Sequence, residues 1–371
     1  MKSNIMMGVV FGNTNDNLLG ELTESRASSA LPFGGRYRVI DFTLSNLVHA
    51  DVSRVAVVTK TNYKSLMDHI ESGKSWDLAR KNGGLTVIPP NSYALSGLNE
   101  TKIRSVYAIL DFIDRSAEEY VVLCDGNLVC NLDMKDMLRR HIDSQADITL
   151  AYKNGPAPNG DDNIMAFEIA DDSRVTKITM AQKHAVCDHS LGITILSKEL
   201  LRNLITEGIG NNYVNLYADV FLRKVNDLKI VGYRVEGYAA VIDSIRSYID
   251  INMDLLAPKV RKELFNRERV VYTKTRNEMP AKYGLDSNVT NSLISDGCII
   301  EGTVENSILF RGVKVGKGSV VRNCVLMQST CVDDGVTLDY ICTDKNVHIG
   351  SGRTLSGTDS YTVYVRKGSE V

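Results

Sequence analysis

The residues that could carry chemistry lie at the end of a short apolar run, in the stretch VVLCDGNLVC at residues 121–130. The run predicts a buried parallel strand, and Asp125, Gly126 and Asn127 end it. A strand that ends in a glycine turn is where an open α/β sheet usually binds its ligand. Phosphate chemistry at such an edge usually relies on a carboxylate that holds Mg²⁺. This strand ends in an asparagine instead, so the role of Asn127 needs an explanation.

The elements that would position this turn follow from the pattern of apolar residues. Over the first two-thirds of the chain, strand-like runs alternate with amphipathic stretches of helical length, which predicts βαβ units around a mostly parallel, Rossmann-like sheet. We expect strands at Met6–Phe11, Val55–Thr59, Tyr120–Cys124, Ile148–Tyr152, Ile164–Ile169, Ile193–Leu196 and Ile230–Arg234. We expect helices at Thr43–Ala50, Lys64–Ser72, Lys102–Asp114, Met134–Gln145, Lys198–Glu207 and Tyr213–Asn226.

The pattern changes after about Asp286, where short valine or isoleucine pairs recur between Gly, Asp and Asn. Apolar residues recur every six positions from Leu309 to Met327, and Gly312 and Gly318 share that spacing. A six-residue period is typical of a hexapeptide parallel β-helix, whose coils turn at small or polar residues. A β-sandwich of short strands is the alternative interpretation.

Length and composition indicate an ordinary two-domain globular protein. The 371 residues exceed the usual size of a single core, and we expect a first domain at 1–250, a helical linker at 251–285 and a β-helix at 286–371. Hydrophobic residues make up 43% of the chain and the net charge is −2. This balance gives no support for a nucleic-acid partner or an anionic membrane surface, and the apolar run Ile5–Phe11 is too short to span a bilayer.

Cysteine and histidine usage predicts no metal site. None of the seven cysteines forms a C-x-x-C pair, so we expect reduced, buried thiols in a cytoplasmic protein. The six histidines show no H-x-x-x-H or Cys/His spacing, and we expect no zinc site. A hexapeptide-repeat acyltransferase would need a catalytic histidine between coils, and His348 is the one candidate in the predicted β-helix.

The segment RASSALPFGGRYRVIDFTLSN, from Arg26 to Asn46, carries a resemblance to a known family. It is similar, without a gap, to the pattern of sugar nucleotidyltransferases, and among them of bacterial ADP-glucose pyrophosphorylases (glucose-1-phosphate adenylyltransferases). YVVLCDGN, SLGITIL and the hexad-rich tail also resemble that family. The resemblance implies a GT-A-type nucleotidyltransferase domain followed by a left-handed parallel β-helix. It also implies a family reaction of ATP with glucose 1-phosphate, which gives ADP-glucose and pyrophosphate for glycogen synthesis.

The chain departs from the family pattern in its phosphate loop. The family loop L-A-G-G-x-G-T-R-L corresponds to FGNTNDNLL, so Asn13 and Thr14 replace paired glycines and Leu18 replaces the arginine. Ser28 replaces the lysine of the next motif. Side chains at the glycine positions would keep backbone N–H groups away from a triphosphate. Loss of both cations would leave charge on the transferred phosphates without a partner.

Both positions of the family's metal ligands have also changed. The resemblance places one aspartate at Asn127 and the other at Val241, so two carboxylates are missing. Asp125 lies roughly 6–7 Å further back along its strand, at about 3.3 Å per residue, which is too far to hold the same ion, and Asp243 has the same problem. We therefore expect no catalytic residue, metal or cofactor in this chain, and Mg²⁺ only in a catalytic partner.

Some binding positions still match the family. Lys183 corresponds to a lysine used on the sugar phosphate, and Ser190 corresponds to a sugar-pocket serine. Arg26 and Arg38 match arginines used for effector anions, and Arg322 is a candidate for a third. The alternative for each of these cations is an ordinary surface charge. The family's G-T-A-D-A substrate turn is replaced by TKIRS at residues 101–105.

These departures indicate a regulatory, non-catalytic subunit of ADP-glucose pyrophosphorylase. The resemblance implies a cytoplasmic mixed tetramer with a separate catalytic subunit, with self-association possible when the chain is alone. Such a subunit would favour the partner's active conformation through differential contacts. The alternatives are an active adenylyltransferase with a rearranged site and a sugar- or nucleotide-binding sensor without a catalytic partner.

Overall fold

The computed structural model describes residues 5–90, 101–158, 164–182 and 185–371. The chain forms two compact units that do not follow chain order. The sheet unit comprises Met1–Ala30, Val39–Asp243 and Arg267–Tyr272. The β-helix unit comprises Leu31–Arg38, Ser244–Asn266 and Thr273–Val371.

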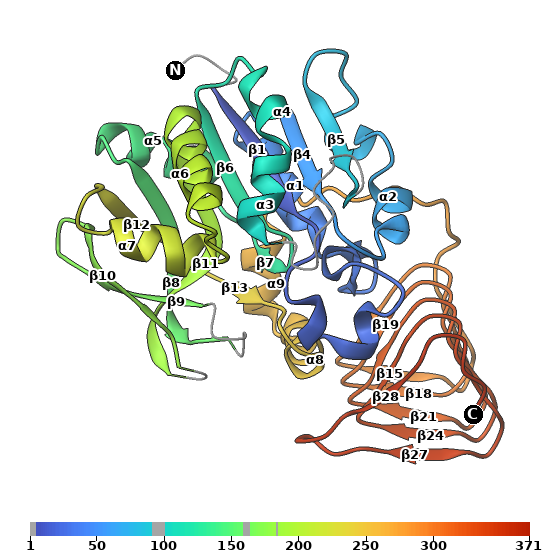
Figure 1. Cartoon of the computed structure of the whole chain (residues 1–371). Coiled ribbons are helices and arrows are strands. Elements are labelled where there is room, and N and C mark those ends of the chain that lie inside the picture. The colour runs from blue at the N-terminus through green and yellow to red at the C-terminus, as the bar shows by residue number, and fades with distance from the viewer. Residues whose placement is uncertain (1–4, 91–100, 159–163, 183–184) are drawn as a thin grey trace. The chain divides into compact units, whose positions relative to one another are not determined.

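One mixed sheet forms the centre of the sheet unit (Figure 1). Its parallel part has the order β6-β1-β4-β5, and antiparallel pairing of β11 with β6 adds a flank of β8 to β12. Within the described residues, the strands of this sheet are β1 (Met6–Phe11), β4 (Arg54–Val58), β5 (Gly84–Ile88), β6 (Tyr120–Asp125), β8 (Ile148–Pro156), β9 (Met165–Ile169), β10 (Val175–Met180), β11 (Val186–Ser197) and β12 (Ile230–Arg234). The predicted nucleotidyltransferase sheet is therefore present, with a larger antiparallel flank than the sequence indicated.

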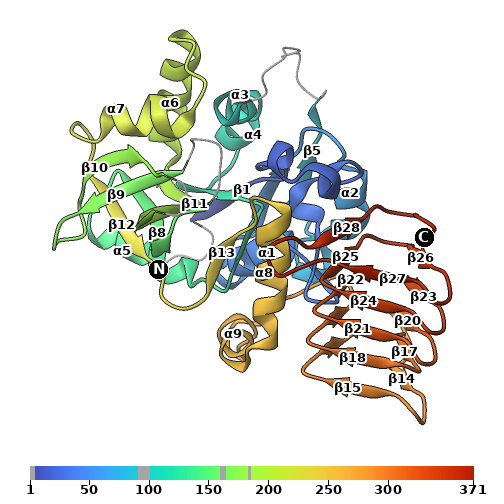
Figure 2. The ribbon, with the colours of Figure 1, turned by 90° about the horizontal axis from the view of Figure 1, so that it is seen from below.

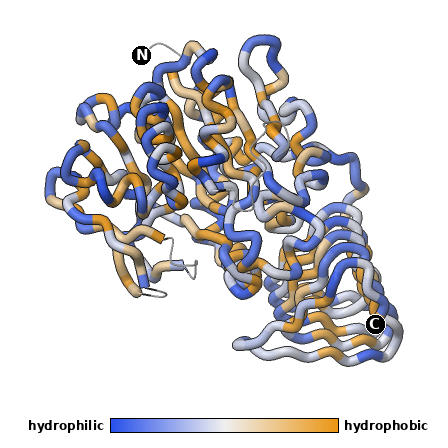
Figure 3. Tube along the Cα trace, viewed as in Figure 1, coloured by the Kyte–Doolittle hydropathy of each residue, from blue (hydrophilic) through white to orange (hydrophobic). Residues whose placement is uncertain are grey.

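Alternation along β1 explains why the sheet is covered on both faces. Met6 and Val10 pack into one core, whereas Met7 and Val9 pack into the other, because successive side chains of a strand point to opposite faces. All six residues of β1 are buried, as expected for a central parallel strand. Figure 3 shows hydrophobic residues along the strands of this sheet.

The helices of the sheet unit divide between the two cores. Helices α1 (Ile40–His49), α2 (Lys64–Ile70) and α5 (Met134–Asp143) contribute buried residues to one core. The other core contains residues from α3 (Lys102–Ala108), α4 (Leu110–Asp114), α6 (Lys198–Gly210) and the π-helix Leu216–Phe221, which α7 (Leu222–Lys224) follows. The helices that contribute to the two cores bury their apolar residues against the two faces of the sheet.

The second unit is built on a parallel β-helix (Figure 2). Its strands form three five-stranded parallel sheets, an arrangement that fits a left-handed β-helix. The first sheet contains β14 (Lys282–Tyr283), β17 (Ile299–Ile300), β20 (Lys314–Val315), β23 (Cys331–Val332) and β26 (His348–Ile349). The second contains β15 (Asn288–Thr290), β18 (Thr303–Glu305), β21 (Val320–Arg322), β24 (Thr337–Asp339) and β27 (Thr354–Ser356). The third contains β16 (Leu293–Ile294), β19 (Ile308–Leu309), β22 (Val325–Leu326), β25 (Ile341–Thr343) and β28 (Val363–Val365).

Residues with positive φ make the corners of the coils. Asn291, Asn306, Asn323 and Tyr340 occupy equivalent corners with φ of 40°, 44°, 49° and 53°. Asparagine tolerates this left-handed conformation because its short polar side chain bonds locally, whereas tyrosine does so at a cost. Asn291 and Asn306, 15 residues apart, share a hydrogen bond, whereas the pair Glu305 and Arg322 spans 17 residues. Coils of unequal length explain why the six-residue period slips along the sequence.

Two other parts of the chain fold with the β-helix. The hairpin of β2 (Pro32–Phe33) and β3 (Tyr37–Arg38) packs on α8 (Ile245–Met253) and α9 (Pro258–Leu264), where Tyr248 donates a hydrogen bond of 2.7 Å to the Pro32 carbonyl. The Gly34–Gly35 turn has φ of 56° and 83°, and a Cβ on Gly35 would lie 2.3 Å from the Ser295 hydroxyl. Only glycine fits this turn.

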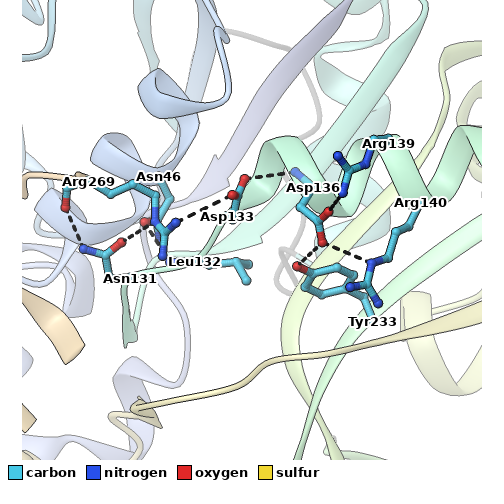
Figure 4. Close-up of polar contacts among 9 residues, drawn as sticks. All are labelled: Asn46, Asn131, Leu132, Asp133, Asp136, Arg139, Arg140, Tyr233 and Arg269. Carbon is cyan, nitrogen blue, oxygen red and sulfur yellow. Dashed lines mark hydrogen bonds and ion pairs between the residues drawn. The ribbon is translucent and has the colours of Figure 1, made fainter. Parts of the chain in front are cut away.

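The segment Arg267–Tyr272 returns to the sheet unit and is held there by side-chain amides. Arg269 Nε donates to Asn131 Oδ1 at 3.0 Å, and Asn131 Nδ2 donates to the Arg269 carbonyl at 2.7 Å (Figure 4). Asn46 connects the same region to α1, because its Oδ1 accepts from the Leu132 N–H at 3.1 Å. Within the described parts of the chain, no helix combines the length and hydropathy that crossing a membrane requires.

Candidate functional site

A cavity of about 320 Å³ lies in the sheet unit at the carboxyl ends of β1 and β6, two strands that pair in parallel with Phe11 opposite Asp125. This is the edge at which open α/β sheets bind ligands, and the volume is within the usual range for a small-molecule site. The cavity is lined by Phe11, Asn13, Thr14, Asn15, Lys60, Thr101, Lys102, Asp125, Asn127, Ile164, Ser190, Leu191, Gly192, Val214, Asn215, Leu216, Tyr217 and Val241.

The loop after β1 closes on itself through its own side chains. Asn13 Nδ2 donates to Asp16 Oδ2 at 2.6 Å, and Asn13 Oδ1 accepts from the Lys60 N–H at 2.8 Å. The Thr14 N–H donates to the Ser28 hydroxyl at 3.0 Å. Asn15 has φ of 59°, so it lies in the left-handed region that glycine would occupy without strain. Three of the altered positions, Asn13, Thr14 and Ser28, thus provide the bonds that hold this loop.

Asp16 takes the position of an anion within that loop. One of its oxygens accepts from the Asn13 amide, and the other accepts from the Ser28 N–H at 3.2 Å. Burial raises the pKa of Asp16, although hydrogen bonds from Ser28 and Asn13 oppose the shift. An internal carboxylate therefore occupies the Asn13 amide and the Ser28 N–H beside the loop, which leaves neither donor for a ligand.

A half-buried ion pair lies in the lining of the cavity. Lys102 Nζ lies 2.6 Å from Asp125 Oδ1 and 2.8 Å from Asp125 Oδ2, and it donates to the Tyr217 hydroxyl at 3.2 Å. The ammonium also lies 4.5 Å from the centre of the Tyr217 ring and 5.4 Å from that of Phe11. Burial lowers the pKa of Lys102, but the charge of Asp125 outweighs it, so the pKa is raised overall. Lys102 is therefore protonated at neutral pH.

Tyr217 is held in its neutral form by the same cluster. Burial and the charge of Asp125 raise the pKa of Tyr217 to about 12, against the opposing effect of Lys102. The hydroxyl consequently accepts a hydrogen bond from the lysine and keeps its own proton. The raised pKa values of Lys102 and Tyr217 keep both side chains protonated at neutral pH, so neither is poised to act as a general base.

Asn127 forms a structural cross-link instead of a metal site. Its Nδ2 donates to the Ile242 carbonyl at 2.8 Å, and its own carbonyl accepts from the Ile242 N–H at 2.9 Å. The bonds extend the antiparallel pair of β7 (Leu128–Cys130) and β13 (Ala239–Val241). The Asn127 side chain is 2% exposed. An aspartate here would place a carboxylate against the Ile242 carbonyl oxygen, so the amide stabilises this arrangement of the two strands.

The residues of the cavity do not fit Mg²⁺. Val241 lines the cavity but has no ligand atom, and the Asn127 amide is committed to Ile242. Asp125 could ligate an ion only if Lys102 were displaced, which would exchange one cation for another. Mg²⁺ is usually held by one or two carboxylates together with substrate phosphates. We therefore assign no metal-dependent step to this cleft.

The other predicted site residues are partly brought together. Ser190 lines the cavity, where its Oγ accepts from the Gly192 N–H at 3.1 Å. Leu18 is half-buried and does not line the cavity. Lys183 lies outside the described residues.

The three arginines expected to bind regulatory anions differ in burial. Arg26, in the sheet unit, is 1% exposed, and its guanidinium donates to the Ser25 hydroxyl at 3.3 Å. Arg38, in the β-helix unit, is 8% exposed. Arg322 lies on β21 with its side chain half exposed, and its Nε lies 2.7 Å from Glu305 Oε2. Arg322 is thus engaged in an ordinary surface ion pair.

Sequence reasoning did not identify Lys102, Asp16 or Tyr217. The signal for Lys102 was present, since TKIRS introduces a lysine where the resembled family has no charge at that position. Its pairing with Asp125, 23 residues away, becomes visible only when α3 is placed against the end of β6. Asp16 carried no signal, because a single acid in a polar loop is ordinarily solvated.

Comparisons with known proteins agree with the two-part architecture. The Nucleotidyl transferase family matches residues 17–163, and the family described as GlmU-like, C-terminal hexapeptide matches residues 279–362. The second match covers most of the β-helix coils.

Whole-chain relatives extend these matches. The chain is 36% identical to the glycogen biosynthesis protein GlgD of Bacillus subtilis, over 99% of this chain and 97% of that protein. It is 38% identical to the glycogen biosynthesis protein GlgD of Geobacillus stearothermophilus, over 86% of this chain and 83% of that protein. It is 30% identical to the glucose-1-phosphate adenylyltransferase of Clostridium perfringens strain 13, over 97% of this chain and 94% of that protein.

Proposed function

Because the chain belongs to the family of GlgD glycogen biosynthesis proteins and glucose-1-phosphate adenylyltransferases, we propose that it is a regulatory subunit without catalytic activity of its own. It acts in the cytoplasm on a catalytic subunit that converts ATP and glucose 1-phosphate into ADP-glucose and pyrophosphate. The observation that carries the proposal is the ion pair between Lys102 and Asp125, which lies in the cavity where a metal and phosphates would have to bind.

The internal bonding of the cleft supports the absence of catalysis. The Asn13 amide and the Ser28 N–H are already bonded to Asp16, and the Asn127 amide is bonded to the Ile242 carbonyl. Removal of one preorganised electrostatic group commonly costs about 10²–10³ in rate, and here the loop cations and both metal ligands are absent together. The intact packing of both units supports a role that depends on a stable scaffold.

The proposed partner is a catalytic subunit of the same family, in a mixed tetramer. A subunit without its own turnover changes the partner's rate by binding one of its conformations more tightly than another. The effect needs the outer surfaces of this chain and does not need its cleft. This separation makes the proposal testable with variants confined to the cleft.

The test compares the purified chain, a catalytic homologue with an intact phosphate loop, and the two proteins co-expressed. We expect no ADP-glucose from this chain alone, a mixed complex by size-exclusion chromatography with mass detection, and a higher turnover or effector response in that complex. As a matched variant, Lys102→Met with Asp125→Asn should leave the complex and its stimulation unchanged.

Each opposite outcome overturns a defined part of the proposal. Robust ADP-glucose formation by this chain alone would establish the alternative, an active adenylyltransferase with a rearranged site. Failure to form a mixed complex would favour a sensor that works without a catalytic partner. Loss of stimulation in the double variant would show that the cleft takes part in regulation.

A further inference from the structure

Three side chains with different metal-binding chemistry lie together on the outside of the β-helix. Cys331 and Asp333 are two residues apart around the buried Val332, and His348 precedes the buried Ile349 on the next coil. Because side chains alternate along a strand, all three point away from the β-helix core. Cys331 lies directly opposite His348 in the parallel pairing of β23 with β26.

The ligand atoms converge on a small volume. His348 Nε2 lies 3.0 Å from Asp333 Oδ2, and Cys331 Sγ lies 3.7 Å from Asp333 Oδ1. One ligand atom from each residue lies within 4.8 Å of the other two. Tetrahedral zinc with bonds of about 2.0–2.3 Å separates its ligand atoms by about 3.3–3.7 Å. The three side chains would need only small rotations to reach that geometry.

The backbone beneath these side chains is fixed by the coils. The Cys331 N–H donates to the Val347 carbonyl at 2.8 Å, the Asp333 N–H donates to Ile349 at 3.0 Å, and the His348 N–H donates to Ser369 at 2.9 Å. Sites built on rigid elements hold their ligands more accurately than sites on loops. The alignment is therefore a property of the fold and does not depend on a flexible segment.

The donor set selects the kind of ion. A thiolate, an imidazole and a carboxylate are typical ligands of Zn²⁺, whereas Mg²⁺ and Ca²⁺ prefer oxygen ligands. In the described parts of the chain, no other group of three His, Cys, Asp or Glu side chains comes as close together. Free cysteines are usually buried, and five of the seven in this chain are, so a partly exposed cysteine beside a histidine and an acid is informative.

Residues that pair with His348 and Cys331 on the adjacent coils surround these three side chains. Glu370 bridges to His348 one coil further along and is exposed, so its carboxylate is a candidate for the fourth position. Lys314 lies opposite Cys331 on the preceding coil and is also exposed, so its long side chain can turn its charge into solvent.

We propose that Cys331, Asp333 and His348 bind one Zn²⁺ on the outer face of the β-helix, with Glu370 or water in the fourth position. The ion would join two successive coils near the C-terminal end of the β-helix. It would require deprotonation of the Cys331 thiol, so binding would release a proton. The proposal is independent of the function proposed above.

Cobalt spectroscopy tests the site directly, because Co²⁺ occupies zinc sites and reports a thiolate ligand. The full chain, stripped of metal with a chelator and kept reduced, is titrated with Co²⁺ and then with Zn²⁺. We expect one equivalent of Co²⁺ to produce a thiolate charge-transfer band in the near ultraviolet, and we expect Zn²⁺ to abolish it. Competition with a chromophoric chelator then gives the zinc affinity.

Variants of the three proposed ligands are compared with variants of residues that should not bind the ion. Cys331→Ser should remove the charge-transfer band, and His348→Ala or Asp333→Asn should weaken zinc binding at least about 10-fold, since even outer-shell partners of a metal site commonly cost about 10–100-fold. The matched controls are Cys187→Ser, which removes the other partly exposed cysteine, and Asp334→Asn, which changes the next acid. Both controls should retain the band and the affinity.

A second measurement follows the thiol itself. In the Cys187→Ser background, Cys331 is the one remaining cysteine that is not buried, so its reaction with a thiol reagent can be followed alone. Zn²⁺ should slow that reaction, and His348→Ala should abolish the protection. A charge-transfer band that persists in Cys331→Ser, the absence of such a band in the unmodified chain, or a thiol that Zn²⁺ does not protect would each overturn the proposal.

Discussion

The cleft of the sheet unit and the outer face of the β-helix differ in the kinds of polar group that they bring together. The cleft has a cavity of about 320 Å³, but its main charged groups are bonded to one another, Lys102 to Asp125 and Asp16 to its own loop. Cys331, Asp333 and His348 on the β-helix also contact one another, but they place three metal-binding atoms of different kinds within 4.8 Å on a partly exposed surface. A cavity by itself is thus a weak sign of ligand chemistry, whereas convergent donor atoms on a rigid scaffold are a stronger one.

The largest expected effect tests whether the cleft is bonded internally. Lys102→Met leaves the carboxylate of Asp125, 13% exposed, without its cation. Breaking such a pair commonly costs about 3–5 kcal/mol when fully buried, so we expect a loss of about 3 kcal/mol in the free energy of unfolding. Urea unfolding followed by fluorescence of Trp76, the one tryptophan and a residue of the sheet unit, measures it.

The control for Lys102→Met is the double variant with Asp125→Asn. Removing both charges should recover most of the lost stability, because the cost lies in the uncompensated carboxylate. If the single variant were as stable as the unmodified chain, the ion pair would not hold the cleft together, and the contrast with the β-helix face would fail.

The next largest effect concerns the amide at the strand end. Asn127→Asp replaces a donor to the Ile242 carbonyl with a buried acceptor, and we expect a loss of about 2–3 kcal/mol. The matched control is Asn211→Asp, where an exposed amide donates to the Glu207 carbonyl and the loss should stay below about 0.5 kcal/mol. Equal losses at the two positions would refute the structural role of Asn127.

Acidification should weaken the sheet unit through a buried histidine. Burial lowers the pKa of His141 to about 4, whereas the unfolded chain titrates near 6.5. The unfolded state therefore binds the proton first, so the stabilisation is complete above pH 6.5 and is lost as the pH falls toward 4. At pH 5 the expected loss is about 2 kcal/mol relative to pH 7.5.

Urea unfolding of the unmodified chain and of His141→Gln at both pH values checks this. The variant should show a smaller difference between pH 7.5 and pH 5, after allowance for its lower stability. A pH dependence that survives in His141→Gln would assign the acid sensitivity to other groups.

The smallest expected effect lies in the β-helix corners. Tyr340 has φ of 53° where the preceding coils have asparagine, so Tyr340→Asn should stabilise the β-helix by about 0.5–1 kcal/mol. Calorimetry of the full chain measures the shift. Tyr361→Asn, a change of an exposed tyrosine in the same unit, should leave the transition where it is. Destabilisation by Tyr340→Asn would mean that packing of the ring outweighs the strain.

Much of the fold could be predicted because local patterns determine it. The buried strand β1 matches the predicted bounds Met6–Phe11, and Pro258 begins α9, as its fixed φ favours. The predicted helix Lys102–Asp114 is two helices in the structure, with Ile109 between them. No proline or glycine marks that break, so the sequence alone could not locate it. The unequal coils of the β-helix likewise obscured a strict period.

The candidate site was predicted less completely. Substituted family positions identified Asn13, Thr14, Asn127 and Val241, which all line the cavity. The new bonds were not visible, because pairs such as Lys102 with Asp125 depend on how separate elements pack. The group of Cys331, Asp333 and His348 was not predicted for the same reason. Spacing rules for metal ligands assume neighbours on one turn or helix, whereas stacked coils bring together residues 15–17 positions apart.

The chain passes between its two units at residues 30, 38, 243, 266 and 272, and this route limits how the gene can be divided. A truncation that ends at residue 243 would remove Arg269 from Asn131 and leave the hairpin of β2 and β3 without its helices. A fragment that begins at residue 273 would lack that hairpin as well. Neither fragment contains a complete structural unit. An exchange of this β-helix between relatives should therefore succeed only when the hairpin of β2 and β3, α8 and α9 are exchanged with it.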